Sequence, residues 1–212
     1  MTIFDFQTLI QHLPVRKQCF TTKRRTWKKF EKESSEYKKI NDQLFNGEDS
    51  LTISREDIFQ TKDVQQLILK TIYWGYPSGM RGSAFWGIIC RLDNLTTIFT
   101  HLSNKKQTFD ELKKQLGLNS ITGLRLSTYS KILYFLKIEF DGCPCLILDS
   151  RLTDVFNAEV FKEFDRFKDI NYHNAPDHYL DYLQCLHDLA EKLKTNGDHI
   201  EQFLFTFGKH LK

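Results

Sequence analysis

Glycine and proline are scarce in this sequence, with ten glycines and four prolines among 212 residues. This composition excludes a collagen-like chain, and a hydrophobic content of 41% excludes a disordered tail. Long hydrophobic runs are also missing, because runs such as Cys145–Leu148 are far shorter than the ~18 residues that a membrane helix needs. No charged and apolar signal segment stands at the N-terminus, so we expect a cytoplasmic protein with no membrane partner.

The five cysteines are odd in number and have no scaffold spacing, which favours free thiols in a reducing compartment. Cys143 and Cys145 are too closely spaced for a zinc knuckle, and only Cys185 follows them, which excludes a C-terminal four-cysteine iron–sulfur cluster. The sequence contains neither a GxxxxGKS/T phosphate loop nor a GxGxxG turn. We therefore expect no metal and no organic cofactor.

Charge is nearly balanced, with a formal net charge of +3, and does not by itself indicate a nucleic-acid partner. Positive charge is concentrated in residues 23–39, where aromatic residues are interleaved with lysines and arginines. Such a segment could follow a row of phosphates. It could equally be a solvated helix face whose cations pair with Glu31, Glu33 and Glu36.

Apolar residues recur with helical spacing, and the alternation typical of strands is scarce. We therefore predict an all-α protein, a single helical body over residues 1–212 that folds as one or two lobes. The predicted helices cover residues 2–13, 26–45, 62–74, 83–102, 108–116, 118–122, 127–138, 150–168, 175–195 and 198–211. Thr61 and Asn174 are predicted to cap helices, and residues 46–50 and 75–82 are predicted breaks.

The most informative pattern is ITGLRLSTYSKILYFL at residues 121–136. A short helix, a turn in which Gly123 takes a positive φ, and a second helix capped by Ser127 would leave several backbone amides pointing outward together. Such a cluster suits one phosphate. The apolar run that follows ends in Asp149 at the start of another helix, where the helix dipole favours the ionised carboxylate.

This order of hairpin, amphipathic helix and apolar run ending in aspartate resembles the helix-hairpin-helix DNA glycosylases, most closely the 8-oxoguanine DNA glycosylase-like branch of bacteria and archaea. Residues 105–160 carry the resemblance. It implies a helical glycosylase fold that flips a damaged or modified base out of duplex DNA and cleaves its N-glycosidic bond. It also implies that hairpin amides bind a phosphate, that a lysine early in the second helix attacks the sugar, and that a later aspartate assists.

Two positions depart from the family pattern. Gly123, Leu124 and Asp149 match it, whereas Arg125 replaces the second hairpin glycine and Ser127 occupies the usual lysine position. The resemblance implies that the hairpin residues bind DNA, and we add two nearby candidate cations, one from residues 73–86 and one that follows Asp149. The predicted DNA-binding residues are Gly123, Leu124, Arg125, Ser127, Arg81 and Arg151.

Lys131 follows Ser127 by one helical turn on much the same face, at an interval from Asp149 close to that of the family. Lys131 and Asp149 are thus the candidate catalytic residues, with Lys131 forming a Schiff base that also permits abasic-site lyase activity. The lysine must attack as the neutral amine, which positive charge from Arg125 or Arg151 would favour. Lys131 could instead be an ordinary surface lysine, with Asp149 supporting a glycosylase that uses water.

Residues 73–86 form a second unusual stretch, in which aromatic side chains stand among glycines. We interpret it as a loop that lines the base pocket or enters the duplex, with Arg81 contacting a phosphate or the orphaned base. The base-pocket candidates are Trp74, Tyr76, Phe85, Trp86 and, from the C-terminal helix, Phe207. The alternative is that these aromatic residues fill the core.

Two other functions stay open. Ser127 at the usual lysine position favours a catalytically inactive glycosylase-fold module that binds nucleic acid or a protein partner as an accessory component of a bacterial antiviral defence system. A weaker option is action on a free nucleoside or on a modified base in RNA. Binding to DNA should weaken steeply with added salt, whereas docking to a protein need not.

Overall fold

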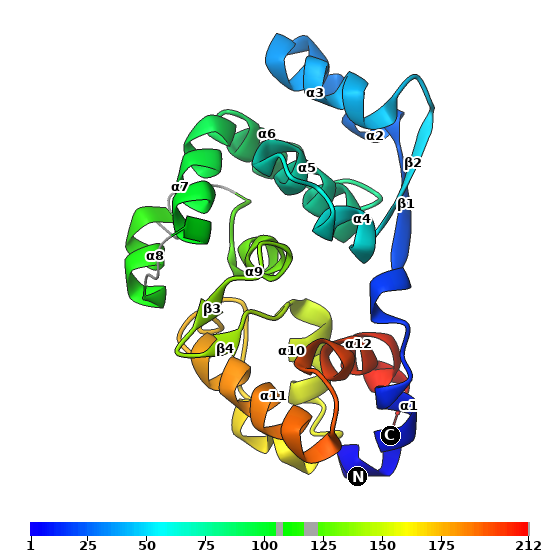
Figure 1. Cartoon of the computed structure of the whole chain (residues 1–212), viewed down its shortest axis with the longest axis vertical. Coiled ribbons are helices and arrows are strands. Elements are labelled where there is room, and N and C mark those ends of the chain that lie inside the picture. Colours follow the sequence, from blue (N-terminus) through cyan, green and yellow to red (C-terminus); the bar gives the residue numbers. More distant parts are fainter. Residues whose placement is uncertain (105–107, 117–122, 212) are drawn as a thin grey trace. The chain divides into compact units, whose positions relative to one another are not determined.

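The computed structural model describes residues 1–104, 108–116 and 123–211. The described residues are mostly helical, with two short antiparallel strand pairs (Figure 1), which confirms the predicted helical class. The chain forms two compact units, one made of Arg16–Leu136 and the other of Met1–Val15 together with Lys137–Lys212. Within the described ranges, no helix is long and apolar enough to span a membrane.

The unit Arg16–Leu136 is built around two buried helices, α5 and α9. Its elements are β1 (Cys19–Lys23), α2 (Arg24–Trp27), η3 (Lys28–Lys32), α3 (Ser35–Phe45), β2 (Ser50–Ser54), α4 (Arg55–Phe59), α5 (Val64–Gly75), α6 (Gly82–Ile89), α7 (Leu92–Asn104), α8 (Phe109–Leu116) and α9 (Leu126–Phe135). Every residue of α9 except Ser127 is buried. A helix that is buried on nearly all sides needs cover on those sides, and α5 supplies much of it.

Aromatic side chains fill the core between α2, η3, α3, α5 and α6. The rings of Trp27 and Tyr73 stack with centroids 4.4 Å apart, and Phe85 lies 4.7 Å from Trp27. The hydroxyls of Tyr37 and Tyr73 are 2.7 Å apart, and Tyr73 donates to Asn41 Oδ1 at 2.7 Å. These bonds satisfy phenol groups that would otherwise be buried without partners.

The second unit joins the two ends of the chain. It contains η1 (Ile3–Phe6), α1 (Gln7–Gln11), β3 (Glu139–Phe140), β4 (Cys143–Pro144), α10 (Ser150–Asn157), η4 (Lys162–Phe167), α11 (Tyr179–Leu193), α12 (Gly197–Phe207) and η5 (Gly208–His210), while η2 (Val15–Lys17) spans the boundary. The N-terminal segment lies beside α12 (Figure 1), where the Phe6 ring is 5.1 Å from that of Phe203. Gln11 Nε2 donates to the carbonyl of Leu193 at 2.7 Å, which satisfies an orphan carbonyl at the end of α11.

Three predicted helices are divided. Residues 26–45 form α2, η3 and α3, because Ser34 adopts an extended backbone and caps α3 by accepting from Tyr37 N at 3.1 Å. Residues 83–102 form α6 and α7, and residues 150–168 form α10 and η4. The pair β1–β2 and the helix α4 were not predicted. The predicted helix at 118–122 lies outside the described residues.

Both predicted breaks are confirmed, whereas both predicted caps are wrong. Helix α3 ends before Asn46, which has a φ of 47°, and α5 and α6 flank the break at 75–82. Helix α5 is capped by Asp63, which accepts from Gln66 N at 2.8 Å, rather than by Thr61. Asn174 closes a turn by accepting from Asn171 N at 2.7 Å, and α11 begins only at Tyr179.

Candidate functional site

A glycine turn leads into α9 and is pressed against α6. Gly123 has a φ of +89°, as predicted, and a Cβ added there would lie 2.5 Å from the carbonyl oxygen of Ala84. Both the backbone conformation and the close approach therefore require glycine. The hydroxyl of Thr128 donates to the carbonyl of Gly123 at 3.0 Å, which fixes the turn to the first turn of α9.

The N-cap of α9 is Arg125, with an extended backbone, and not Ser127 as predicted. Ser127 lies inside the first turn and is half-buried, and Leu124 is buried at 1% exposure. A side chain at this position of a helix cannot reach the first free amides, so Ser127 is available for other contacts.

Lys131 supplies the main contact of Ser127. Lys131 is buried at 3% exposure, and its Nζ donates to the Ser127 carbonyl at 2.8 Å and to Ser127 Oγ at 3.3 Å. Side chains of a helix point back toward its N-terminus, which explains why the ammonium reaches the preceding turn. The Nζ atom of Lys131 therefore lies next to the side chain of Ser127, which occupies the usual lysine position.

Tyr76 and Gly75 enclose the Lys131 side chain from the end of α5. Nζ lies 5.7 Å from the Tyr76 ring centroid, and a Cβ on Gly75 would be 3.0 Å from Lys131 Cδ. The Tyr76 hydroxyl is 2.9 Å from Thr128 Oγ1 and 3.3 Å from Ser127 Oγ. The predicted lysine, serine and tyrosine thus form one cluster, in which Gly75 makes room for the alkyl chain.

Asp149 belongs to the other unit, where it lies at the start of α10 as predicted and also caps that helix. Its backbone is extended and its Oδ1 accepts from Arg151 N at 3.0 Å. The carboxylate is partly exposed and follows four buried residues, Cys145–Leu148. A carboxylate in this place is held by the first amides of a helix.

Two tyrosines of α11 hold the backbone that leads to Asp149, and sequence reasoning missed both. Tyr179 donates to the carbonyl of Leu146 at 2.8 Å, and Tyr182 donates to the carbonyl of Ile147 at 2.7 Å. Among the residues that the structure describes, no strand pairs with Leu146 or Ile147, and the tyrosine hydroxyls supply the donors to their carbonyls instead. Their spacing within α11 is the only signal in the sequence, and it does not identify their acceptors.

The cysteines of this segment are buried thiols. Burial raises the pKa of Cys145, and it also raises the pKa of Cys143, which donates to Gln184 Oε1 at 3.3 Å. Thiols of this kind stay protonated at neutral pH and are poor metal ligands. In the described part of the chain, no three histidine, cysteine, aspartate or glutamate side chains are grouped closely enough to hold a metal ion.

The predicted aromatic residues divide between core and surface. Trp74 and Phe85 are core residues, at 3% and 0% exposure, and Trp74 packs edge-on against Phe135 at 5.4 Å. Tyr76 and Trp86 are half-buried and remain accessible. In the other unit, Phe207 is half-buried beside Phe203, with ring centroids 5.8 Å apart.

A buried arginine explains the position of Trp74. Arg55 is 1% exposed and its guanidinium lies 5.2 Å from the ring centroids of both Trp74 and Tyr134. Its Nε donates to Gln18 Oε1 at 2.7 Å and its Nη1 to the Tyr134 hydroxyl at 3.2 Å. Trp74 is one wall of this cluster, and no pattern in the sequence indicates that Arg55 is buried.

The basic segment separates into paired and unpaired cations. Arg24 forms ion pairs with Glu31 at 3.0 Å and with Asp42, and Asp42 also pairs with Lys38 at 2.5 Å. The hydrogen bonds from Lys38 and Arg24 lower the pKa of Asp42. The exposed cations that make no ion pair within the described part of the chain are Lys23, Arg25, Lys28, Lys29, Lys32 and Lys39.

The remaining predicted DNA contacts lie in both units. Arg81 is exposed at the N-cap of α6, and Arg125 is half-buried at the N-cap of α9. Arg151 is exposed in α10, with its guanidinium 4.6 Å from the ring centroid of Phe205.

Comparison with known proteins identifies the family of the chain. The family model described as "Putative 8-oxoguanine DNA glycosylase OGG-like protein" matches residues 13–205. No curated protein and no solved structure matches the chain. The family match covers the hairpin glycine, the Lys131 cluster and Asp149, and extends over most of both units. The chain therefore belongs to the OGG-like 8-oxoguanine DNA glycosylase family.

Proposed function

We propose that this protein removes an oxidised, 8-oxoguanine-like base from duplex DNA, with Lys131 as the nucleophile. One observation carries the proposal. Lys131 Nζ lies 3.3 Å from the Oγ of Ser127, so the amine stands next to the position where the family pattern has its lysine. Membership in a DNA glycosylase family supplies the reaction class and the DNA partner.

In the proposed reaction, the neutral amine of Lys131 attacks C1′ of the sugar. The N-glycosidic bond breaks and its electron pair leaves with the base. Loss of a proton from nitrogen and opening of the sugar ring then give a Schiff base, from which the strand can be cleaved by β-elimination. A covalent intermediate of this kind divides one difficult step into two easier ones.

Asp149 has a proposed role based on its environment and on the family resemblance. The Asp149 carboxylate, held at the start of α10, can oppose the positive charge that develops on the sugar. Tyr179 and Tyr182 would act as positioning residues, because they hold the backbone that precedes this carboxylate.

Borohydride trapping tests the nucleophile. Borohydride reduces a Schiff base to a stable amine, so wild-type protein should become linked to a duplex that carries 8-oxoguanine and not to the undamaged duplex. Lys131→Gln should abolish trapping. Lys62→Gln is the matched control, because Lys62 is exposed and lies just before the first residue of α5, at the end of that helix away from Gly75.

A double variant sharpens the test. Ser127→Lys combined with Lys131→Ser moves the amine back to the usual family position while keeping one lysine and one serine in the cluster. This variant should regain trapping that Lys131→Gln lacks. Trapping of Lys131→Gln at the wild-type level would contradict the proposed nucleophile.

The second candidate function is a binding module without catalysis, and Ser127 at the family's lysine position favours it. A base-release assay run alongside the trapping separates the candidates. Base release without an adduct would indicate a glycosylase that uses water and Asp149. Duplex binding with neither release nor adduct would indicate an accessory module, of the kind expected for a defence system.

A further inference from the structure

Exposed side chains along η3 and α6 are basic at one end of the two elements and acidic at the other end. These two elements are packed together by Phe30 and Phe85, whose ring centroids are 4.8 Å apart. Lys29 lies at one end of this contact, because its Nζ would be 3.4 Å from a Cβ placed on Gly82, the first residue of α6. Glu33 lies toward the other end, where it lines a cavity with Trp86.

The basic end contains three cations from two elements. Lys29 and Lys32 are three positions apart in a 3₁₀ helix, in which side chains at this spacing eclipse each other on one flank. Arg81 immediately precedes Gly82. All three side chains are exposed and make no ion pair within the described ranges. We call Lys29, Lys32 and Arg81 the cationic corner.

Lys29 is held in place by contacts that leave its charge available. Its Nζ lies 4.8 Å from the centroid of the Phe30 ring, whose side chain is buried. Gly82, which lies next to the Lys29 ammonium, has no side chain that could keep a ligand away from it. By contrast, Arg24 of the same basic segment is neutralised by Glu31 and Asp42.

The cationic corner lies close to the hairpin glycine. Gly123 is pressed against the carbonyl of Ala84, which is two residues beyond Gly82 in the first turn of α6. One turn of an α-helix rises about 5.4 Å, so the two features are within a turn of each other. Residues two apart lie on different faces of a helix, so the corner and the hairpin glycine meet α6 at one level but on different sides. A duplex, whose major groove alone is about 12 Å wide, is broad enough to reach both.

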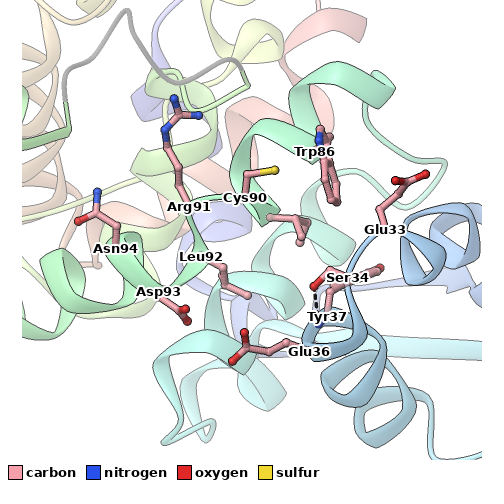
Figure 2. Close-up of a pocket in the computed structure, with 11 residues that line it drawn as sticks. Glu33, Ser34, Glu36, Tyr37, Trp86, Cys90, Arg91, Leu92, Asp93 and Asn94 are labelled. Atoms are coloured by element: carbon pink, nitrogen blue, oxygen red, sulfur yellow. Dashed lines mark hydrogen bonds between the residues drawn. The ribbon is translucent and has the colours of Figure 1, made fainter.

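The acidic end lies at the other end of α6. A cavity of about 520 Å³ is lined by Glu33, Glu36 and Asp93 and by one cation, Arg91, together with Trp86 and Cys90. Figure 2 shows the Glu33 carboxylate near the Trp86 indole and Glu36 across the hollow. Carboxylates repel phosphates, so this end is unsuited to a nucleic-acid backbone and limits where one can run.

We propose that the cationic corner is a second phosphate-binding surface that holds the sugar–phosphate backbone of a DNA duplex bound at the hairpin. The inference rests on the proposed function for its partner. It assigns to Lys29 and Lys32 a role in affinity for any duplex, damaged or not, because phosphate contacts carry no information about the base.

The test is the salt dependence of binding to an undamaged duplex, measured by fluorescence anisotropy over a series of salt concentrations. Each phosphate contact contributes about 0.9 to the slope of log K against log salt for duplex DNA. Lys29→Gln and Lys32→Gln should each reduce the slope by about this amount, and Lys62→Gln, which removes the same charge elsewhere in the unit, should not.

The outcomes separate this inference from the proposed function. If wild-type protein binds the duplex and the Lys29→Gln and Lys32→Gln slopes equal that of Lys62→Gln, the second surface is wrong and the glycosylase proposal stands. If these slopes fall as expected while base release and trapping fail, the surface is supported and the proposed chemistry is wrong. Circular dichroism of each variant confirms that the fold is retained.

Discussion

At the scale of single residues, the central feature is a lysine that stands one helical turn beyond the usual family position and extends its amine back to the residue at that position. Lys131 is buried, and its Nζ bonds to both the carbonyl and the hydroxyl of Ser127. A reversed arrangement, with the lysine at 127, would place the amine beyond the start of α9. The exchange of positions is therefore compatible with a retained nucleophile.

Tyr76 provides a prediction at this scale. Tyr76→Phe removes hydroxyl contacts to Thr128 and Ser127 but keeps the ring near Lys131 Nζ. We expect a loss of about 1 kcal/mol in the free energy of unfolding, because a partly buried group of hydroxyls loses one of its members. Urea unfolding measures this loss, and a Tyr76→Phe variant as stable as wild type would show that the hydroxyl is not bonded.

The activity of the same variant adds a second readout. Tyr76→Phe should still be trapped on damaged DNA, since the amine and the ring remain in place. Tyr76→Leu, which lacks the ring, should lose more trapping than Tyr76→Phe at equal protein stability. Equal trapping by both variants would indicate that the ring has no part in positioning Lys131.

At the scale of elements, the entry into α9 depends on a glycine that is required twice. Gly123 has a left-handed backbone, and it also lies so close to the carbonyl of Ala84 that a residue with a Cβ would clash there. Because α9 begins three residues later, any shift of this turn moves the helix that carries Lys131. The turn is thus part of the fold of the site and not only a candidate DNA contact.

Gly123→Ala should destabilise the protein more than a matched glycine substitution. Gly47 also has a positive φ, of 85°, but a Cβ there would meet nothing within 4 Å. Gly47→Ala should cost about 1 kcal/mol for the left-handed conformation, and Gly123→Ala about 1–3 kcal/mol more for the clash. Chemical unfolding compares the two, and equal losses would contradict the close approach to α6.

The helical class, both chain breaks, the Gly123 turn and the Asp149 cap could be predicted from local sequence, because each depends on a few neighbouring residues. The β1–β2 pair could not be predicted locally, since Cys19 pairs with Ser54, far along the chain. The burial of Arg55 escaped prediction for the same reason, because the rings that cover it come from α5 and α9.

At the scale of the whole molecule, the first residues complete a unit formed otherwise by the last third of the chain. Ile3 and Ile10 are fully buried there, and Phe6 packs against Phe161 and Phe203. The family match begins at residue 13, after this segment. The unit that carries Asp149 therefore depends on residues outside the matched range.

Two substitutions in α1 test this dependence. Ile10→Ala should lower the free energy of unfolding by about 2–5 kcal/mol, because it leaves a cavity in the core. Leu9→Ala should change it by less than about 0.5 kcal/mol, because Leu9 is 43% exposed in the same helix. Hydrogen exchange of the Ile10→Ala variant should show reduced protection in α12. Equal losses of unfolding free energy in Ile10→Ala and Leu9→Ala would contradict the packing of α1 against α12.

The central claim is that Lys131 is the nucleophile, and the most direct measurement is to identify the residue that carries the trapped sugar. Protein reduced with borohydride on a duplex containing 8-oxoguanine is digested, and the modified peptide is sequenced by mass spectrometry. The account predicts the adduct on Lys131, within α9. An adduct on the N-terminal amine or on any other lysine would contradict it.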